Sequence, residues 1–190
     1  MDKTKSKILK AAAEHFVNKG FSGTSISDIA KSAGINQSLI YHHIGNKQDL
    51  WKAVKLYLIP DNLIQESNEF IEYDSVENFL DKIIAQRIGL YLADKRITRI
   101  IQWQNLEDSN QEIAGGSQLS PKIWVQKIEK LQEKGKITDK YQAEFFAFTI
   151  FSLVNSIIFD HFHIFSEDET KRNNYIQLIK ENLLIILKKK

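Results

Sequence analysis

One short stretch constrains the fold more than any other: TSISDIAKSAGINQSLIYHHIGNK, residues 24–47. An amphipathic helix pattern begins at Ser25, which opens a capping-box sequence, and stops before Gly34. A second helical pattern covers residues 37–43, with Asn36 as a suitable N-cap. Glycine readily adopts the left-handed backbone that ends a helix. The stretch therefore predicts two helices of roughly two turns each, joined by a tight turn.

The residues around this turn fit two helices that cross closely. The first helix needs a small residue where the backbone of the second passes, and Ala30 meets that need, with Gly34 four residues later in the turn. The apolar contacts between the helices are expected from Ile29, Ala33, Ile35 and Ile40. The outward positions of the second helix are Gln37, Ser38, Tyr41 and His42. This is the geometry of a helix-turn-helix, whose second helix enters a DNA major groove about 12 Å wide.

Charge is distributed unevenly along the chain. Residues 1–60 hold nine lysines and four acidic residues, a net charge of +5, whereas the whole chain of 190 residues carries only +2. A basic first third on a mildly acidic remainder fits a protein whose amino-terminal part meets a polyanion. A solvated lysine-rich helix face would give the same count.

The whole chain is predicted to be all-α, with about nine helices and no strand. Two prolines and eight glycines leave little material for the turns of an all-β protein. The expected helices are 3–19, 25–33, 37–43, 47–58, 76–92, 95–107, 121–134, one that begins at Asp139, and a last one that starts at a Ser166–Glu169 capping box. Pro60 is expected to end or kink the fourth helix.

At this point the sequence resembles the DNA-binding region of the tetracycline-repressor (TetR) family over roughly residues 5 to 55. The motif residues that carry the resemblance are Thr24, Ile29-Ala30, Ala33-Gly34, Tyr41-His42, Lys47 and Leu50. Residues 133–158 are similar to the family's seventh and eighth helices, though less diagnostic. The sequence departs from the family pattern at Gln37-Ser38, His43 and Gly45-Asn46, which leaves the operator sequence undetermined.

The resemblance implies a transcriptional regulator, most commonly a repressor, that binds double-stranded DNA. It implies that Thr24, Tyr41 and Lys47 contact backbone phosphates. Geometry adds that Gln37 and Ser38, at the start of the second helix, read bases, with His42 on a base or a phosphate. We expect a DNA-binding domain over residues 1–46 and an effector-binding and dimerisation domain over residues 47–190.

The run FFAFTIFSLVNSIIF, residues 145–159, is apolar nearly all round and must be covered on every side. It is too short for a membrane span. We expect one face to pack on a second copy of the chain, so that a homodimer binds a palindromic operator. The candidate interface residues are Thr149, Ser152 and Ser156, with Leu178, Leu183 and Ile186 from the last helix. Packing within one chain is the alternative for each of them.

Aromatic and amide side chains of three helices form a candidate pocket for a small, largely apolar effector. They are Gln102, Trp103, Trp124, Phe148, Phe151 and Asn155. Pockets combine aromatic walls with a few polar groups in this way. A filled core in which Asn155 is satisfied internally is the alternative. The resemblance implies an effector-binding domain here.

No pattern for catalysis, a metal or a cofactor stands out. His161 and His163 are two residues apart, which directs them to different sides of a helix, and phosphate-binding glycine loops are absent from the sequence. An all-helical enzyme or small-molecule carrier without DNA binding is the rival class. The amino terminus has no signal-peptide pattern and the chain has no cysteine, so a cytoplasmic location is expected.

Overall fold

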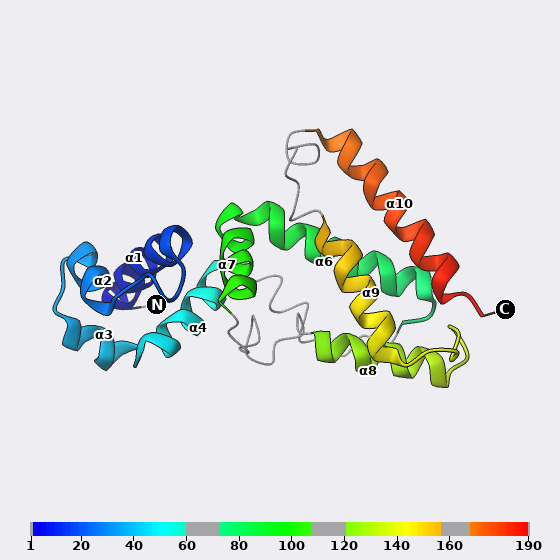
Figure 1. The fold of residues 1–190 in the computed structure, drawn as a ribbon, viewed down its shortest axis with the longest axis horizontal. Coiled ribbons are helices and arrows are strands. Elements are labelled where there is room, and N and C mark those ends of the chain that lie inside the picture. Colours follow the sequence, from blue (N-terminus) through cyan, green and yellow to red (C-terminus); the bar gives the residue numbers. More distant parts are fainter. Residues whose placement is uncertain (1, 60–72, 108–120, 157–167, 190) are drawn as a thin grey trace. The chain divides into compact units, whose positions relative to one another are not determined.

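The computed structural model describes residues 2–59, 73–107, 121–156 and 168–189, and these residues form nine α-helices without a strand (Figure 1). The helices are α1 Lys3–Lys19, α2 Ile26–Ala33, α3 Gln37–His43, α4 Lys47–Leu58, α6 Val76–Ala93, α7 Lys95–Leu106, α8 Pro121–Glu133, α9 Ala143–Asn155 and α10 Glu169–Leu187. The predicted all-α class is confirmed. Within the described stretches, no helix has the length and apolar character to cross a membrane.

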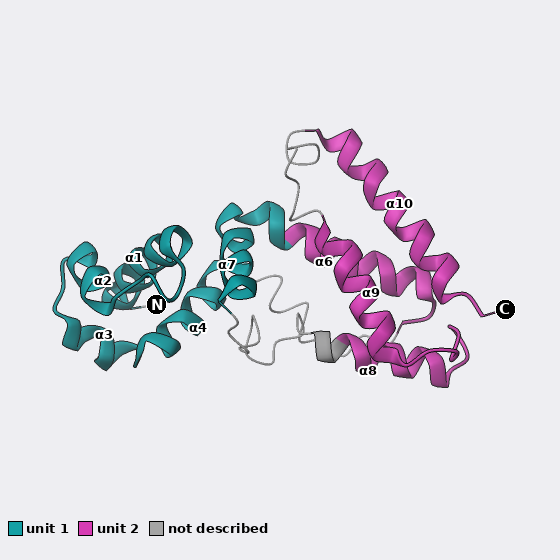
Figure 2. Ribbon diagram, viewed as in Figure 1, with its two compact units in different colours: residues 1–64, 90–117 teal, residues 65–89, 118–190 magenta. Residues whose placement is uncertain are grey.

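The chain divides into two compact units (Figure 2). Unit 1 combines residues 1–64 with residues 90–117, and unit 2 combines residues 65–89 with residues 118–190. Unit 1 therefore holds α1 to α4 together with α7, and the last turn of α6 belongs to it as well. The functional division predicted at residue 46 remains a prediction.

Short polar side chains start the helices of unit 1. The Ser25 hydroxyl accepts a hydrogen bond from the backbone N–H of Asp28 at 3.0 Å, and the Asn36 side chain accepts one from Ser38 at 3.2 Å. Asn46 and Asp49 form a full capping box at the start of α4. These contacts satisfy N–H groups that a helix leaves without an intrahelical partner. They explain why three short helices can follow one another so closely.

The core of unit 1 lies between α1, α4 and the helix-turn-helix pair. Phe16 of α1 meets Trp51 of α4 edge-on, with ring centroids 4.9 Å apart, and both rings are buried. Ile29 of α2 and Ile40 of α3 are also fully buried. Helix α7 packs on α1 and α4. One core thus fixes the positions of α2, α3 and α7.

Unit 2 is built from α6, α8, α9 and α10 around its own apolar core. Its fully buried members are Phe79, Leu80, Ile83, Ile128, Ile137, Ile150, Val154, Leu183 and Leu187. Helices α8 and α9 pack on each other, and α10 packs on α9.

Two predicted helix starts differ from the structure. Helix α9 begins at Ala143 and not at Asp139, because the Gln132 side chain donates hydrogen bonds to the carbonyls of Thr138 and Tyr141 at 3.0 and 2.9 Å. These bonds hold the preceding residues outside the helix. Helix α10 begins at Glu169, and its N-cap is Asp168, which accepts from the backbone N–H of Lys171. The predicted cap Ser166, and Pro60, lie outside the described residues.

Candidate DNA interface and ligand site

The turn between α2 and α3 is closed by glycine. Gly34 has φ 65° and ψ 39°, the left-handed conformation, and Ile35 donates a hydrogen bond back to the carbonyl of Ala30 at 3.0 Å. Ala30 is buried, so a larger side chain at this position would have to displace its neighbours. Helix α3 therefore packs against α2 as the sequence predicts, with Ile40 inward.

All the residues of α3 that are predicted to contact DNA lie on its outer, exposed face. Gln37 and Ser38 are exposed in its first turn, and Tyr41 and His42 are exposed one turn later. Positions separated by three or four residues lie on one face of a helix. Tyr41 keeps 54% of its surface exposed. An exposed aromatic side chain on this face is available for contact with a partner.

Two further residues are predicted to contact phosphates. One lies at the start of α4 and the other in the turn between α1 and α2. Lys47 opens α4, and its Nζ lies 4.4 Å from the centroid of the Phe21 ring. Thr24 is only 2% exposed, and its hydroxyl donates a 2.7 Å hydrogen bond to the carbonyl of Gly20. That hydroxyl therefore stabilises the turn after α1, and the phosphate contact of Thr24 remains a prediction.

Sequence reasoning overlooked a polar contact between the start of α1 and the end of α3. The Nδ1 atom of His43 lies 3.3 Å from a carboxylate oxygen of Asp2, which also caps α1 by accepting from Thr4. His15 of α1 and Ser32 of α2 are joined by a 2.7 Å hydrogen bond. These polar contacts tie α1 to both helices of the helix-turn-helix. None of them is visible as a local sequence pattern.

The predicted effector residues fall into both units. Gln102 and Trp103 belong to unit 1, where the Trp103 Nε1–H donates to the carbonyl of Val17 at 3.0 Å. Trp124 and Phe151 belong to unit 2 and lie edge to face, with centroids 6.0 Å apart. The predicted convergence of the two groups therefore remains a prediction.

The other two members of the set differ in burial. Asn155 is buried in unit 2, close to the end of α9. Phe148 is 72% exposed, so it points away from the core that Phe146 and Ile150 enter from the same helix. The structure therefore brings Trp124 and Phe151 together and leaves Phe148 on the surface.

The structure adds one residue to this aromatic pair. Arg87 of α6 is only 1% exposed, and the central carbon of its guanidinium lies 5.0 Å from the ring centroids of both Trp124 and Phe151. Rings cover the guanidinium by cation–π contact, while its N–H donors lie in its own plane. A sequence signal existed, because Arg87 follows the buried Ile83 and Ile84 at helical spacing and shares their face.

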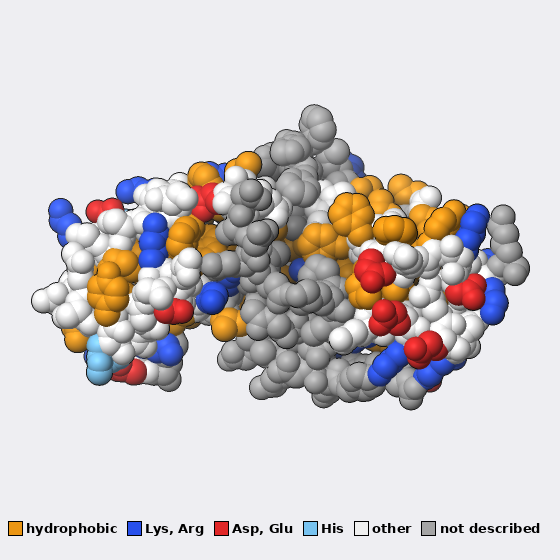
Figure 3. Space-filling model, turned by 60° about the horizontal axis from the view of Figure 1, so that its bottom comes forward, with side chains coloured by type: hydrophobic (Ala, Val, Ile, Leu, Met, Phe, Trp, Pro, Cys, Tyr) orange, Lys and Arg blue, Asp and Glu red, His pale blue; other side chains and the backbone are white. Residues whose placement is uncertain are grey.

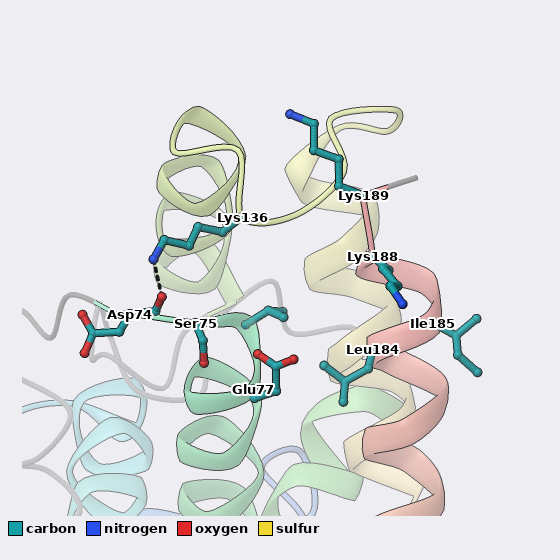
Figure 4. Close-up of a pocket in the computed structure, with 9 residues that line it drawn as sticks. Asp74, Ser75, Glu77, Lys136, Leu184, Ile185, Lys188 and Lys189 are labelled. Atoms are coloured by element: carbon teal, nitrogen blue, oxygen red, sulfur yellow. Dashed lines mark hydrogen bonds between the residues drawn. The ribbon is translucent and has the colours of Figure 1, made fainter.

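A hollow of unit 2, about 510 Å³ in volume, lies where the start of α6 approaches the end of α10 (Figure 4). Lysines and acidic residues both line it, and the Lys136 amine donates to the carbonyl of Asp74. None of the predicted effector residues lines this hollow.

Two of the three predicted dimer residues in and just after α9 have partners within the chain. The Thr149 hydroxyl donates to the carbonyl of Phe145 at 2.8 Å, and the Ser156 hydroxyl lies 2.8 Å from that of Tyr175. Ser152 is exposed.

On α10, Leu178 and Ile186 are exposed, whereas Leu183 is fully buried in the core of unit 2. Three further apolar residues of these two helices, Phe145, Phe148 and Ile185, are exposed. Figure 3 shows hydrophobic side chains gathered over one part of unit 2.

The fold and the outer face of α3 define a helix-turn-helix DNA-binding protein. The sequence profile described as bacterial regulatory proteins, tetR family, matches residues 8–54. The transcriptional repressor SCO4008 of Streptomyces coelicolor is 26% identical over 155 residues, which cover 80% of this chain and 77% of that protein. The negative transcriptional regulator IcaR of the biofilm operon icaADBC in Staphylococcus aureus is 27% identical over 138 residues, 70% of this chain and 72% of IcaR.

Solved structures agree on the fold. GusR of Salmonella enterica superposes with a TM-score of 0.68 at 20% identity, and the match covers 97% of this chain and 95% of GusR. The amino-terminal region of the chain, residues 8–54, is a TetR-family DNA-binding region. The protein is a DNA-binding transcriptional regulator and not an enzyme.

Proposed function

We propose that the protein represses transcription by binding a palindromic operator as a homodimer, and that a small effector releases it. The observation that carries the proposal is the outer face of α3, where four polar or aromatic side chains stand exposed beside a basic first helix. The name of the S. coelicolor relative, a transcriptional repressor, supports repression as the sign of control. Action on DNA is consistent with the expected cytoplasmic location.

The proposed contacts divide by role. Gln37 and Ser38 read base edges, because the first turn of a recognition helix lies deepest in the major groove. Thr24, Tyr41 and Lys47 hold backbone phosphates, which fix the orientation of the protein without reading sequence. His42 contacts a base or a phosphate.

We expect Lys47→Ala and Gln37→Ala to weaken DNA binding in different ways. Loss of the Lys47 amine removes one phosphate contact, so affinity should fall about equally for every DNA and the slope of log affinity against log salt should flatten by about 0.9. Loss of the Gln37 amide should cost about 1–3 kcal/mol on the operator and little on random DNA. The measurement uses operators selected from genomic fragments by the purified protein, with titrations on operator and random duplex at several salt concentrations.

An equal loss on both duplexes for Gln37→Ala would remove that residue from the base-reading set. Failure to select any preferred fragment would contradict the proposed function as a whole. The rival class of an all-helical carrier predicts that failure.

The dimer proposal rests on the apolar surface of unit 2. Exposed aromatic and aliphatic side chains on α9 and α10, namely Phe145, Phe148, Leu178, Ile185 and Ile186, would lose their water contact against a second copy. Two helices from each chain then form a four-helix interface around a two-fold axis. A symmetric dimer requires inverted half-sites in the operator, about 34 Å apart.

We expect light scattering to give about twice the chain mass of 22.0 kDa, and Phe148→Asp to shift the protein toward the monomer. The charge would be buried in the interface without a partner, which costs several kcal/mol. Leu92→Asp is the matched control, because Leu92 is similarly apolar and 53% exposed but belongs to unit 1. A monomer at micromolar concentration for the parent protein, or equal effects of the two substitutions, would contradict this interface.

We propose that the effector combines an apolar body with an acidic group. Trp124 and Phe151 supply aromatic contact area, and the buried Arg87 beside them carries a positive charge that favours an acidic group. Asn155 adds a second buried polar side chain in the same unit. The position of Arg87 therefore adds an acidic group to the largely apolar effector that the sequence predicts.

A further inference from the structure

The turn that follows α1 has two backbone N–H groups directed away from its own helix. Gly20 ends α1 by donating to the carbonyl of Phe16 at 3.0 Å, and Thr24 closes the turn through its hydroxyl. The N–H groups of Phe21 and Ser22 take no part in these bonds. Backbone donors without an acceptor are costly wherever water cannot reach them.

Glu107 supplies both acceptors from a distant part of the chain. Its Oε2 accepts from Phe21 N–H at 3.0 Å and its Oε1 accepts from Ser22 N–H at 3.1 Å, across 86 and 85 residues of sequence. Hydrogen bonds to a charged carboxylate are about twice as strong as neutral ones. One turn earlier on α7, the Trp103 Nε1–H donates to the carbonyl of Val17. We call Trp103 and Glu107 the α7 clamp.

The backbone of the turn is shaped to fit this clamp. A Cβ atom on Gly20 would lie 2.8 and 2.9 Å from carbons of the Trp103 ring and would overlap the Glu107 carboxylate. Gly20 also has φ 70° and ψ −175°, a conformation that is essentially restricted to glycine. Helix α7 can therefore approach the turn this closely only because Gly20 has no side chain.

The other side of the same turn faces the predicted phosphate contact. The Phe21 ring lies under the Lys47 amine and packs on Trp51 with centroids 5.8 Å apart. The backbone of Phe21 is thus held by Glu107 while its ring supports Lys47. Ser25, the N-cap of α2, follows four residues later.

We propose that Glu107 is a positioning residue for DNA binding: it contacts no DNA itself and acts by fixing the turn that supports Lys47. The proposal rests on the proposed phosphate contact of Lys47. The direction in which DNA affinity changes when the Glu107 carboxylate is removed distinguishes a positioning role from a purely electrostatic one. An acidic side chain repels phosphates, so its removal should strengthen DNA binding if only charge matters. A positioning role predicts the opposite.

The experiment compares Glu107→Gln with Glu14→Gln in the full-length protein. Glutamine is nearly isosteric but offers one oxygen and a competing N–H₂ group, so it cannot accept both backbone bonds. We expect about tenfold weaker binding to operator and random duplex alike, with the salt slope lower by about 0.9. Glu14 is an exposed acid of α1 in the same unit, so Glu14→Gln makes the same charge change and should leave both values unchanged or raise affinity slightly.

A double-mutant cycle tests whether the effect passes through Lys47. Lys47→Ala should cost about tenfold in the parent protein but less than about threefold in the Glu107→Gln protein, because the contact is already impaired. Equal affinity of Glu107→Gln and parent, stronger binding by Glu107→Gln, or full additivity with Lys47→Ala would each overturn the proposal. If instead Lys47→Ala alone leaves binding unchanged, the proposed phosphate contact fails, and the clamp as stated fails with it.

Circular dichroism confirms that each variant is folded before binding is measured. If Glu107→Gln does not fold, Trp103→Phe replaces it, since that change keeps an aromatic ring at the position and removes the donor to Val17 together with part of the indole. It should weaken binding about threefold on both duplexes, and an unchanged affinity would overturn the proposal.

Discussion

Gly20→Ala should lower the free energy of unfolding of unit 1 by roughly 4 kcal/mol. The backbone conformation of Gly20 costs a non-glycine residue on the order of 1–3 kcal/mol. The added methyl group must also displace the Trp103 ring and the Glu107 carboxylate, and forced repacking of this kind costs about 1–3 kcal/mol more. Both costs arise at the same position, so the loss should exceed that of an ordinary glycine substitution.

Gly34→Ala provides the matched control. Gly34 also has positive φ, but in the ordinary left-handed region, and a Cβ atom there meets no other atom within 4 Å. Its replacement should cost only about 1 kcal/mol. Urea unfolding followed by tryptophan fluorescence measures both, in a Trp124→Phe background, where Trp51 and Trp103 report on unit 1 alone. Equal losses for the two variants would contradict the close packing of α7 on the turn.

Arg87→Leu should abolish discrimination between acidic and neutral effectors. A carboxylate close to the charged Arg87 guanidinium gains about 1.5–3 kcal/mol, which corresponds to roughly tenfold to hundredfold in affinity. A neutral molecule of the same length lacks that gain. The parent protein should therefore release its operator at lower concentrations of the acid, and the Arg87→Leu protein should respond to both alike.

Fluorescence anisotropy of a labelled operator measures this release with a series of straight-chain carboxylates and the alcohols of the same length. Phe151→Ala should weaken the response to both kinds of molecule, since the ring provides apolar contact without charge. A normally folded Arg87→Leu protein that still prefers the carboxylates by the parental factor would show that the acidic group binds elsewhere.

Local sequence signals were sufficient for most of the fold. Ser25, Asn36 and Asn46 each cap the helix that they were expected to cap, and Gly34 ends α2 in the expected conformation. These features depend on residues within one turn of each other, so spacing alone reveals them. The helix-turn-helix was predictable for the same reason.

The orientation of α9 was not predictable from periodicity. Helix α9 is apolar on every side, so the pattern does not show which face enters the core. The structure buries Phe146 and exposes Phe148, which sequence reasoning had assigned to the effector pocket. The start of α9 was misplaced because its position depends on Gln132, a residue of another helix.

Contacts across long sequence separations escaped prediction as well. Nothing near Glu107 indicates that its carboxylate accepts from Phe21 and Ser22. The sequence also does not indicate that the Trp103 indole N–H bonds to α1, and the assignment of Trp103 to the effector pocket remains a prediction. A side chain's partner at this distance depends on the packed fold, which a single sequence does not display.

The discontinuous make-up of unit 1 has a consequence for hybrid regulators. A graft that takes only α1 to α4 from this protein would leave behind α7, and with it the acceptors of Phe21 and Ser22 and the donor to Val17. The transplanted helices would then meet a foreign helix that lacks these groups. A hybrid that exchanges operator specificity should therefore contain residues 90–107 together with residues 1–59. Gly20 then keeps its contacts with Trp103 and Glu107.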